Sequence, residues 1–355
     1  MSLDALDTPA LLVDLDIMEA NIARVAETCR ARGVAWRPHF KGHKTIEIAK
    51  KQIAAGAIGL TCAKLGEAEV LADAGIRDLM IANQIVGPIK MRRLAALLDR
   101  ADVIVSVDSE ENVRELADAV QGKSLRVVIE VNTGMNRAGV EPGEPCLALA
   151  KFIAGKPGLQ FAGLMGWEGH AAPLDADIKT RAVTAAVRSI VQSAEMCRAA
   201  GLPVAIVSCG GTGTYWLSAA QPGITEIQAG GGVFCDVHYR KDFGVEHPYA
   251  LTVMTSVSSR PTPTRIVCDA GKKTMSTDAS MPAPIGLDHI RSVRLSAEHA
   301  TIELDAPNTS LRVGDRLEWV AGYSDTTVHL HDEIYGVRKG RIEAVWPIVG
   351  RGKLR

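Results

Sequence analysis

The stretch Ala205-Ile206-Val207-Ser208-Cys209-Gly210-Gly211-Thr212-Gly213-Thr214 joins a short β-branched run to a glycine-rich loop. Similar strand candidates recur along the chain, eight in all: Val34–Arg37, Ile58–Cys62, Leu79–Ala82, Val103–Val107, Arg126–Val131, Phe161–Met165, Ala205–Ser208 and Glu226–Ala229. Helical patterns lie between them, such as Thr45–Ala54, Leu65–Ala74, Gly87–Leu98, Ser109–Ala119 and Leu174–Ala200. This α/β alternation predicts a (β/α)8 barrel of the TIM type, and a doubly wound sheet is the competing interpretation.

After about Glu246 the pattern changes from alternating strands and helices to strands alone. The β-like runs there are Tyr249–Arg260, Arg265–Cys268, Ile290–Leu295, Ala300–Glu303, Arg316–Val320, Glu333–Arg338 and Arg341–Ile348. We therefore expect two domains, a barrel over residues 14–245 and an all-β domain over residues 246–355. The N-terminal segment 1–13 could add a strand to the second domain.

The composition indicates a globular protein of the reducing cytoplasm. The 355 residues are 47% hydrophobic and 23% charged, with a formal net charge of −1. Such a balance lacks the clustered basic excess expected for a nucleic-acid or membrane surface. No apolar run reaches the roughly 18 residues of a membrane span, and no secretory leader is evident. The seven scattered cysteines form no Cys-x-x-Cys pair, as expected where thiols stay reduced.

The segment Arg37-Pro38-His39-Phe40-Lys41-Gly42-His43-Lys44 directly follows the first strand of the predicted barrel. Barrel enzymes build their sites from the loops at the carboxyl ends of the strands. A lysine there, with cations nearby to lower its pKa, can form a Schiff base with an aldehyde. Lys41 is our candidate for that role, with His39 as a second residue in contact with a cofactor. The alternative is a basic surface loop.

Two glycine-rich loops follow the last two strands of the predicted barrel. One contains Gly211, Thr212, Gly213 and Thr214, and the other contains Gly230, Gly231 and Gly232. Consecutive backbone N–H groups can surround a phosphate, the threonine hydroxyls add donors, and barrels often bind phosphate at these two places. Flexible turns are the alternative, and neither loop matches a nucleotide-binding motif.

Three further candidates follow the fifth and sixth strands. Arg137 could hydrogen-bond a phenolic oxygen of a cofactor, and the flat ring of Trp167 could pack near it. His170 is a candidate acid or base. A surface arginine and a structural histidine are the alternative interpretations.

A possible metal site lies near the C-terminus, in Asp325-Thr326-Thr327-Val328-His329-Leu330-His331-Asp332. Asp325 and either His329 or His331 could bind a divalent metal such as Mn²⁺, Mg²⁺ or Zn²⁺. On a strand, His329 and His331 would share one face. A hydrogen-bonded turn and strand without metal is the alternative.

Taken together, these segments resemble the fold-type III pyridoxal-phosphate family of D-threonine aldolases and D-serine dehydratases, which share a barrel with alanine racemases. The resemblance extends over nearly the whole chain, from Thr8-Pro9-Ala10 to Arg351-Gly352. It implies pyridoxal 5′-phosphate on Lys41, with Thr212, Gly213, Thr214, Gly230 and Gly231 around its phosphate. It also implies a C-terminal β domain, a small amino acid as substrate and a homodimer.

The sequence departs from this family at the metal site. Members that resemble the chain bind a divalent metal through a His-x-Asp or His-x-Cys pair, and the matching positions are Tyr323 and Asp325. Either His329 or His331 substitutes for the missing histidine, or the site is metal-free. Trp167 and Gly232 also stand where such members often have tyrosine.

The resemblance leaves several reactions open. We expect a lyase that cleaves a D-3-hydroxy amino acid to glycine and an aldehyde, with His170 as the base. The alternatives are dehydration of such an amino acid to a 2-oxo acid and ammonia, and metal-free racemisation with Lys41 and Tyr323 as opposed bases. A pyridoxal-phosphate carrier or regulator without catalytic activity is the non-enzymatic alternative.

Overall fold

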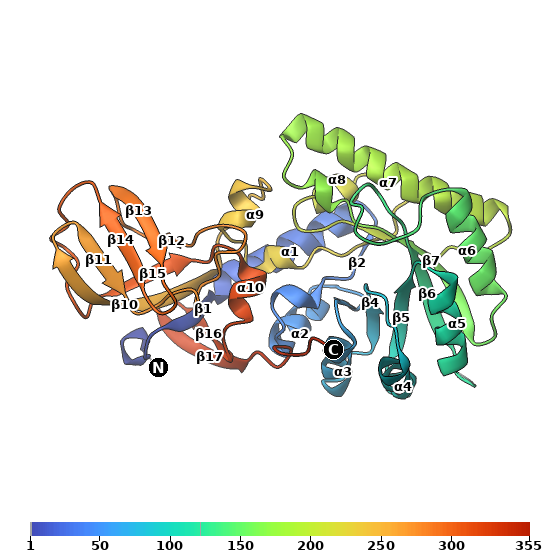
Figure 1. Cartoon of the computed structure of the whole chain (residues 1–355), viewed down its shortest axis with the longest axis horizontal. Helices are drawn as coiled ribbons and strands as arrows, with labels where there is room; N and C mark the ends of the chain where they lie inside the picture. The colour runs from blue at the N-terminus through green and yellow to red at the C-terminus, as the bar shows by residue number, and fades with distance from the viewer. Residues whose placement is uncertain (1, 121) are drawn as a thin grey trace. The chain divides into compact units, whose positions relative to one another are not determined.

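The computed structural model describes residues 2–120 and 122–355. The chain divides into two compact units, which Figure 1 draws with their strands and helices labelled. The β unit comprises the described residues up to Asn21 together with Gly231–Arg351, and the barrel unit comprises Ile22–Gly230 together with Gly352–Arg355. Each unit contains a sheet of its own.

The barrel unit contains a sheet of eight parallel strands. They are β2 (Ala35–Trp36), β3 (Leu60–Cys62), β4 (Asp78–Ile81), β5 (Asp102–Val107), β6 (Leu125–Glu130), β7 (Leu159–Met165), β8 (Ile206–Cys209) and β9 (Glu226–Ile227). Their hydrogen-bonded order is β2-β9-β8-β7-β6-β5-β4-β3. A parallel bridge between His39 and Thr61 joins the two ends, and the Thr61 N–H donates to the Pro38 carbonyl at 2.9 Å. This closure confirms the (β/α)8 barrel and rules out a doubly wound sheet.

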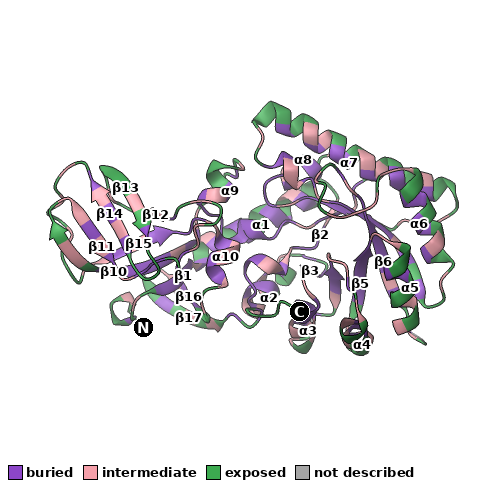
Figure 2. Cartoon of the chain, viewed as in Figure 1, coloured by how far each residue is buried: buried purple, intermediate pink, exposed green. Residues whose placement is uncertain are grey.

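Helices precede and connect the strands of the barrel, as the amphipathic patterns predict. The helix α1 (Leu15–Ala31) begins in the β unit and precedes the first barrel strand. The others lie between successive strands and are α2 (Ile46–Ala54), α3 (Leu65–Asp73), α4 (Pro88–Leu97), α5 (Glu110–Ala119), α6 (Glu144–Ala154), α7 (Ala176–Ala199) and α8 (Tyr215–Ser218). In Figure 2 the barrel strands are mostly buried, whereas the helices carry alternating buried and exposed residues. No helix in the described ranges combines the length and apolar character that a bilayer span needs.

A cluster of apolar side chains fills part of the barrel interior. Its buried members come from the five successive strands β4 to β8: Met80, Ile104, Val128, Met165 and Ile206. The cluster contains no helix residue, so these side chains face one another inside the barrel. Alternation along each strand places the neighbouring side chains toward the helices.

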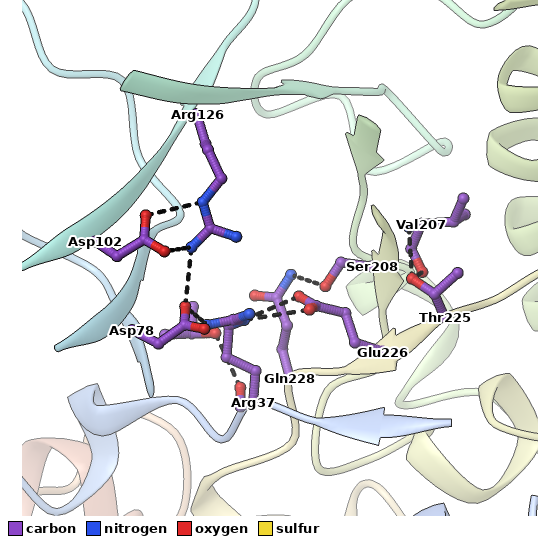
Figure 3. Close-up of polar contacts among 10 residues, drawn as sticks. Arg37, Asp78, Asp102, Arg126, Val207, Ser208, Thr225, Glu226 and Gln228 are labelled. Carbon is purple, nitrogen blue, oxygen red and sulfur yellow. Dashed lines mark hydrogen bonds and ion pairs between the residues drawn. The ribbon is translucent and has the colours of Figure 1, made fainter. Parts of the chain in front are cut away.

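A polar network occupies the end of the barrel where the strands begin (Figure 3). Arg37 is almost fully buried and pairs with Glu226 at 3.2 Å and with Asp78 at 2.6 Å. Arg126 continues the network to Asp78 at 3.2 Å and to Asp102 at 2.8 Å. Because active sites of barrels lie at the opposite end, we interpret these ion pairs as structural.

The β unit is built on a second, largely antiparallel sheet. Its strands are β1 (Ala10–Asp14), β10 (Leu251–Thr262), β11 (Arg265–Cys268), β12 (Ala283–Pro284), β13 (Ile290–Leu295), β14 (Ala300–Leu304), β15 (Arg316–Val320), β16 (Glu333–Arg338) and β17 (Arg341–Pro347). The main order is β13-β14-β11-β10-β1-β16-β17, and β15 pairs with β10 and β12. The expected β-rich C-terminal fold is confirmed. Two short helices, α9 (Val237–Lys241) and α10 (Ser324–Val328), accompany the sheet.

Candidate active site

Lys41 lies in a single 3₁₀ turn, Phe40–Gly42, directly after β2 at the carboxyl end of a barrel strand. His39 is the N-cap of this turn, and its Nδ1 accepts a hydrogen bond of 3.3 Å from the Lys41 N–H. The pKa of His39 is held well below its usual range, first by burial and then by the positive charge of Lys41. An acceptor nitrogen must carry no proton, so a neutral ring suits this bond. His39 therefore helps to fix the backbone at Lys41.

The second lysine of this segment, Lys44, has a different partner. Its backbone is left-handed, with a φ of 50°, and its amine forms an ion pair with the buried Glu67. The other carboxylate oxygen of Glu67 accepts the N–H groups of Ala63 at 2.6 Å and Lys64 at 3.1 Å. The pair thus joins the lysine segment to the loop after β3, which is a structural role, and Lys41 stays the candidate for chemistry.

Trp167, in the loop after β7, is the residue around which several candidates gather. The Lys41 Nζ lies 5.7 Å from the centroid of its ring, and the Arg137 guanidinium carbon lies 5.2 Å from it. A Cβ added to Gly211 would come within 2.4 Å of the indole Nε1. The Thr133 hydroxyl donates to the Trp167 carbonyl at 2.9 Å, which fixes the backbone beneath the ring. Residues from the loops after β2, β6 and β8 therefore meet at one aromatic ring.

Arg137 is also close to a buried carboxylate at the end of β6. Its Nη2 lies 3.5 Å from Glu130 Oε1, and the Gln84 amide donates to the other oxygen of Glu130 at 2.7 Å. The Arg137 side chain is 54% exposed. A guanidinium has five N–H groups, so Arg137 keeps donors for a ligand while it contacts Glu130.

His170 lies in a 3₁₀ turn, Gly169–Ala171, after β7. Its Nδ1 is buried and makes no hydrogen bond to any described residue. Its ring faces Gly134 of the loop after β6, where an added Cβ would lie 3.1 Å from Nε2. A buried ring nitrogen without a protein partner is unusual in a folded protein, which makes His170 a candidate for contact with a bound molecule.

The glycine loop after β8 contains Gly210, with a left-handed φ of 82°, and leads through the buried Thr212 and Gly213 to Thr214. The carboxylate of Glu168 holds this loop. Its Oε1 accepts the hydroxyls of Thr214 and Ser218, each at 2.6 Å. Sequence reasoning assigns no role to Glu168, because a glutamate after a strand gives no sign that it will be buried.

The second glycine loop contains the boundary between the two units. At Gly230, the last residue of the main barrel segment, an added Cβ would lie 2.2 Å from the His39 carbonyl oxygen, so only glycine fits. Gly231 begins the β unit, and a Cβ there would lie 2.4 Å from the Tyr239 hydroxyl. The Gly232 carbonyl is 2.9 Å from His247 Nδ1.

Tyr323 and Asp325 belong to the β unit. Tyr323 precedes α10, and its ring contacts His238 and Tyr239, with centroids 5.3 and 5.9 Å away. Burial, and after it the charge of Asp325, raises the pKa of the Tyr323 phenol. Ser324 donates both its N–H and its hydroxyl to one oxygen of the buried Asp236, each at 2.7 Å.

The expected strand through His329 and His331 is wrong. The residues before them form the helix α10, His329 is the C-cap of that helix, and His331 lies in the segment between α10 and β16. The two rings therefore do not alternate along a strand. His331 Nε2 is 2.9 Å from the Thr274 carbonyl, and burial lowers the pKa of His331. Over the described ranges, no three histidine, cysteine, aspartate or glutamate side chains gather as a metal site would need.

The chain resembles known proteins over its whole length. Residues 13–237 match the alanine racemase N-terminal domain family, and residues 250–337 match a putative serine dehydratase domain. A 3-hydroxy-D-aspartate aldolase of Paracoccus denitrificans is 35% identical over 98% of this chain and 93% of its own.

Solved structures agree with these matches. A D-threonine aldolase from Filomicrobium marinum superimposes with a TM-score of 0.95 and 33% identity, over 100% of this chain and 98% of its own. A D-threo-3-hydroxyaspartate dehydratase from Delftia sp. HT23 gives a TM-score of 0.87 and 29% identity, over 98% of each chain.

Proposed function

The chain belongs to the alanine racemase N-terminal domain family, a pyridoxal-phosphate-dependent family, and on that premise we propose that it cleaves D-3-hydroxy amino acids to glycine and an aldehyde. The similarity to a 3-hydroxy-D-aspartate aldolase and to a D-threonine aldolase supports this lyase activity. The observation that carries the proposal is the position of Lys41 at a strand end, with its amine 5.7 Å from the Trp167 ring.

The residues of the barrel unit fit pyridoxal 5′-phosphate. Lys41 provides a primary amine to hold the cofactor's aldehyde carbon, and the glycine loop after β8, with Gly230 at the end of the main barrel segment, provides backbone N–H groups for its phosphate. The clearances at Gly211 and Gly230 support this fit, because a Cβ at either position would clash with Trp167 or with His39. When bound, the cofactor supplies an electron sink for the substrate's Cα.

The surrounding side chains supply orientation and proton transfer. We assign the base that accepts the β-hydroxyl proton to His170, whose buried Nδ1 has no protein partner in the described chain. Trp167 provides a flat apolar surface, and Arg137, 5.2 Å from that ring, provides N–H donors for an oxygen of the cofactor or the substrate.

The side chains around Tyr323 do not fit a divalent metal. A buried phenol with a raised pKa keeps its proton and is a poor ligand compared with an imidazole. Asp325 is therefore the only member of the expected pair with a side chain that suits a divalent metal. We therefore route no step of the reaction through a metal, and we keep Tyr323 as a candidate proton donor or acceptor.

The test is a product assay on the purified full chain with pyridoxal 5′-phosphate. D-Threonine, D-phenylserine and 3-hydroxy-D-aspartate, each with its L-enantiomer, are incubated with the protein, and glycine and aldehyde are measured. We expect both products from at least one D-isomer, and none from the L-isomers. The absence of glycine and aldehyde from all three D-substrates would refute the proposal.

Two lysine variants serve as a matched pair in this assay. Lys41→Ala should abolish product formation and the visible absorbance of bound cofactor. Lys50→Ala, at an exposed position on α2, should keep both. Equal activity in the two variants would remove Lys41 from the mechanism.

The dehydratase reaction is the second candidate, supported by the similarity to a D-threo-3-hydroxyaspartate dehydratase and to a putative serine dehydratase domain. The same incubations distinguish it, because dehydration yields a 2-oxo acid and ammonia with no glycine. Racemisation predicts neither pair of products and is detected as deuterium incorporation at Cα.

We also propose that the chain works as a homodimer in the cytoplasm. The family resemblance supports the dimer, and seven free, buried cysteines are what a reducing compartment allows. Sedimentation velocity of the purified protein tests the dimer, and a purely monomeric species would contradict it.

A further inference from the structure

Glu168 is a fully buried carboxylate that lies between two loops of the barrel mouth. It follows β7, and its Oε1 accepts the hydroxyls of Thr214 and Ser218 at 2.6 Å each. Its Oε2 accepts a longer bond of 3.4 Å from the Gly210 N–H. These three donors come from the start of the glycine loop, from its end, and from the last residue of α8.

Such a carboxylate needs a reason to be in the interior. Burying a charged group costs free energy unless hydrogen bonds compensate, and the structure gives Glu168 two short ones. It is an odd neighbour for an anion-binding loop, since its own charge repels a phosphate. Glu168 must therefore serve the loop by fixing its conformation through hydrogen bonds, and not by attracting the phosphate.

The hydroxyl protons of Thr214 and Ser218 show which donors of the loop remain for a phosphate. A threonine hydroxyl carries one proton, and that of Thr214 points to Glu168. Thr214 then has no hydroxyl proton for a phosphate, and the loop must use its backbone N–H groups and other donors. The Ser218 proton is likewise directed to Glu168.

The adjacent residue holds the same loop from another side. The indole of Trp167 contacts Gly211 closely enough that an added Cβ would lie 2.4 Å from Nε1. Trp167 and Glu168 thus contact the glycine loop and the helix that follows it. Trp167 packs against Gly211, and Glu168 accepts hydrogen bonds from Gly210, Thr214 and Ser218. The loop after β8 is shaped by the loop after β7.

We propose that Glu168 is a positioning residue, which acts through Thr214 and Ser218 to hold the glycine loop in the conformation that binds the cofactor's phosphate. This inference rests on the proposed function, because it takes pyridoxal 5′-phosphate as the ligand of that loop. It assigns Thr214 a role as a link to Glu168 rather than as a direct phosphate ligand.

The test compares two probes that differ only in the phosphate, pyridoxal 5′-phosphate and pyridoxal. The affinity of each for the cofactor-free full chain is measured by titration of the visible absorbance. The ratio of the two affinities isolates the phosphate loop, whereas general loosening of the barrel weakens both probes together. In Glu168→Ala we expect the preference for the phosphorylated probe to fall roughly tenfold, the size of one lost hydrogen-bond contribution.

Three further variants keep the test decisive if Glu168→Ala does not fold. Thr214→Val and Ser218→Ala should lower the ratio in the same direction, and Thr214→Ser, which keeps the hydroxyl, should restore it. An unchanged ratio in Glu168→Ala or Ser218→Ala would overturn the proposal. So would a loss confined to Thr214→Val, because Thr214 would then bind the phosphate itself.

Failure of the proposed function has a different signature. In that case the unmodified chain would bind neither probe through Lys41, and Lys41→Ala would leave both titrations unchanged. A wild-type chain that binds both probes, with a ratio insensitive to Glu168, would refute only the positioning role.

Discussion

The guanidinium of Arg37 and the carboxylate of Glu226 form a buried ion pair inside the barrel, with Nε 3.2 Å from both carboxylate oxygens (Figure 3). Removing one partner of such a pair leaves an uncompensated charge in the interior. We expect Arg37→Met to lower the free energy of unfolding by about 3–5 kcal/mol.

The matched control for Arg37 is another arginine of the barrel unit, Arg100, which pairs with Asp73 at the surface. Arg100→Met should cost no more than about 1 kcal/mol, because exposed ion pairs contribute little. Urea denaturation followed by far-ultraviolet circular dichroism measures both variants. Equal losses would contradict the structural role of the buried network.

Gly211 provides a second prediction, on cofactor affinity. An alanine there would place its Cβ within 2.4 Å of the Trp167 Nε1, so the ring or the loop must move. Overpacking of this kind costs about 1–3 kcal/mol of folding stability. Because the loop belongs to the proposed phosphate site, we expect pyridoxal 5′-phosphate to bind more weakly to Gly211→Ala. Gly155→Ala is the control, because its Cβ would meet only ordinary contacts of 3.7 Å. Titrations that give the same affinity for both variants would disprove the close packing.

The sequence predicts the barrel well because each buried strand carries its own signal. A run such as Arg126–Val131 is β-branched and short, and it matches β6 (Leu125–Glu130) to within a residue at each end. The position of Lys41 at the carboxyl end of the first barrel strand is equally predictable, because it follows once that strand is recognised.

The sequence fails where a distant contact decides the structure. The residues Thr326-Thr327-Val328 favour a strand by propensity, yet they form α10. That helix begins at Ser324, which donates twice to Asp236, 88 residues away. Glu168 is missed for the same reason, because its partners Thr214 and Ser218 belong to another loop. Local patterns contain no information about such partners.

His43 provides a prediction about acid stability. Its ring is fully buried, lies 3.1 Å from Gln52 Oε1, and has a pKa lowered to about 4, mainly by burial. In the unfolded chain its pKa is about 6.5. The folded state therefore resists protonation, so the stabilisation is present above about pH 6.5 and is lost as the pH falls toward 4. Between about pH 7 and pH 5 the loss from this group should be about 2 kcal/mol.

The variant His43→Gln keeps a hydrogen-bonding group but does not titrate. The difference in unfolding free energy between the wild type and this variant should shrink as the pH falls, as measured by urea denaturation at several pH values. His299→Gln, at an exposed position, should leave the pH dependence of the wild type unchanged. A difference that is constant with pH would show that His43 is not buried as a neutral ring.

We predict that Tyr323 keeps the β unit from binding a divalent metal. It stands two residues before Asp325, the spacing of the His-x-Asp pair that the family resemblance implies, but a phenol stands in place of the imidazole. We expect the wild type to retain its activity after treatment with a chelator, and to bind Zn²⁺ no better than a surface carboxylate does. Tyr323→His supplies the missing imidazole beside Asp325 and should tighten Zn²⁺ binding at least about tenfold.

Tyr335→His is the control, because it adds a histidine to the same unit with Val337 two residues later. Metal content after desalting and calorimetric titration measure the three proteins. Tight binding by the wild type, or equal binding by the two histidine variants, would mean that a different set of side chains holds the metal.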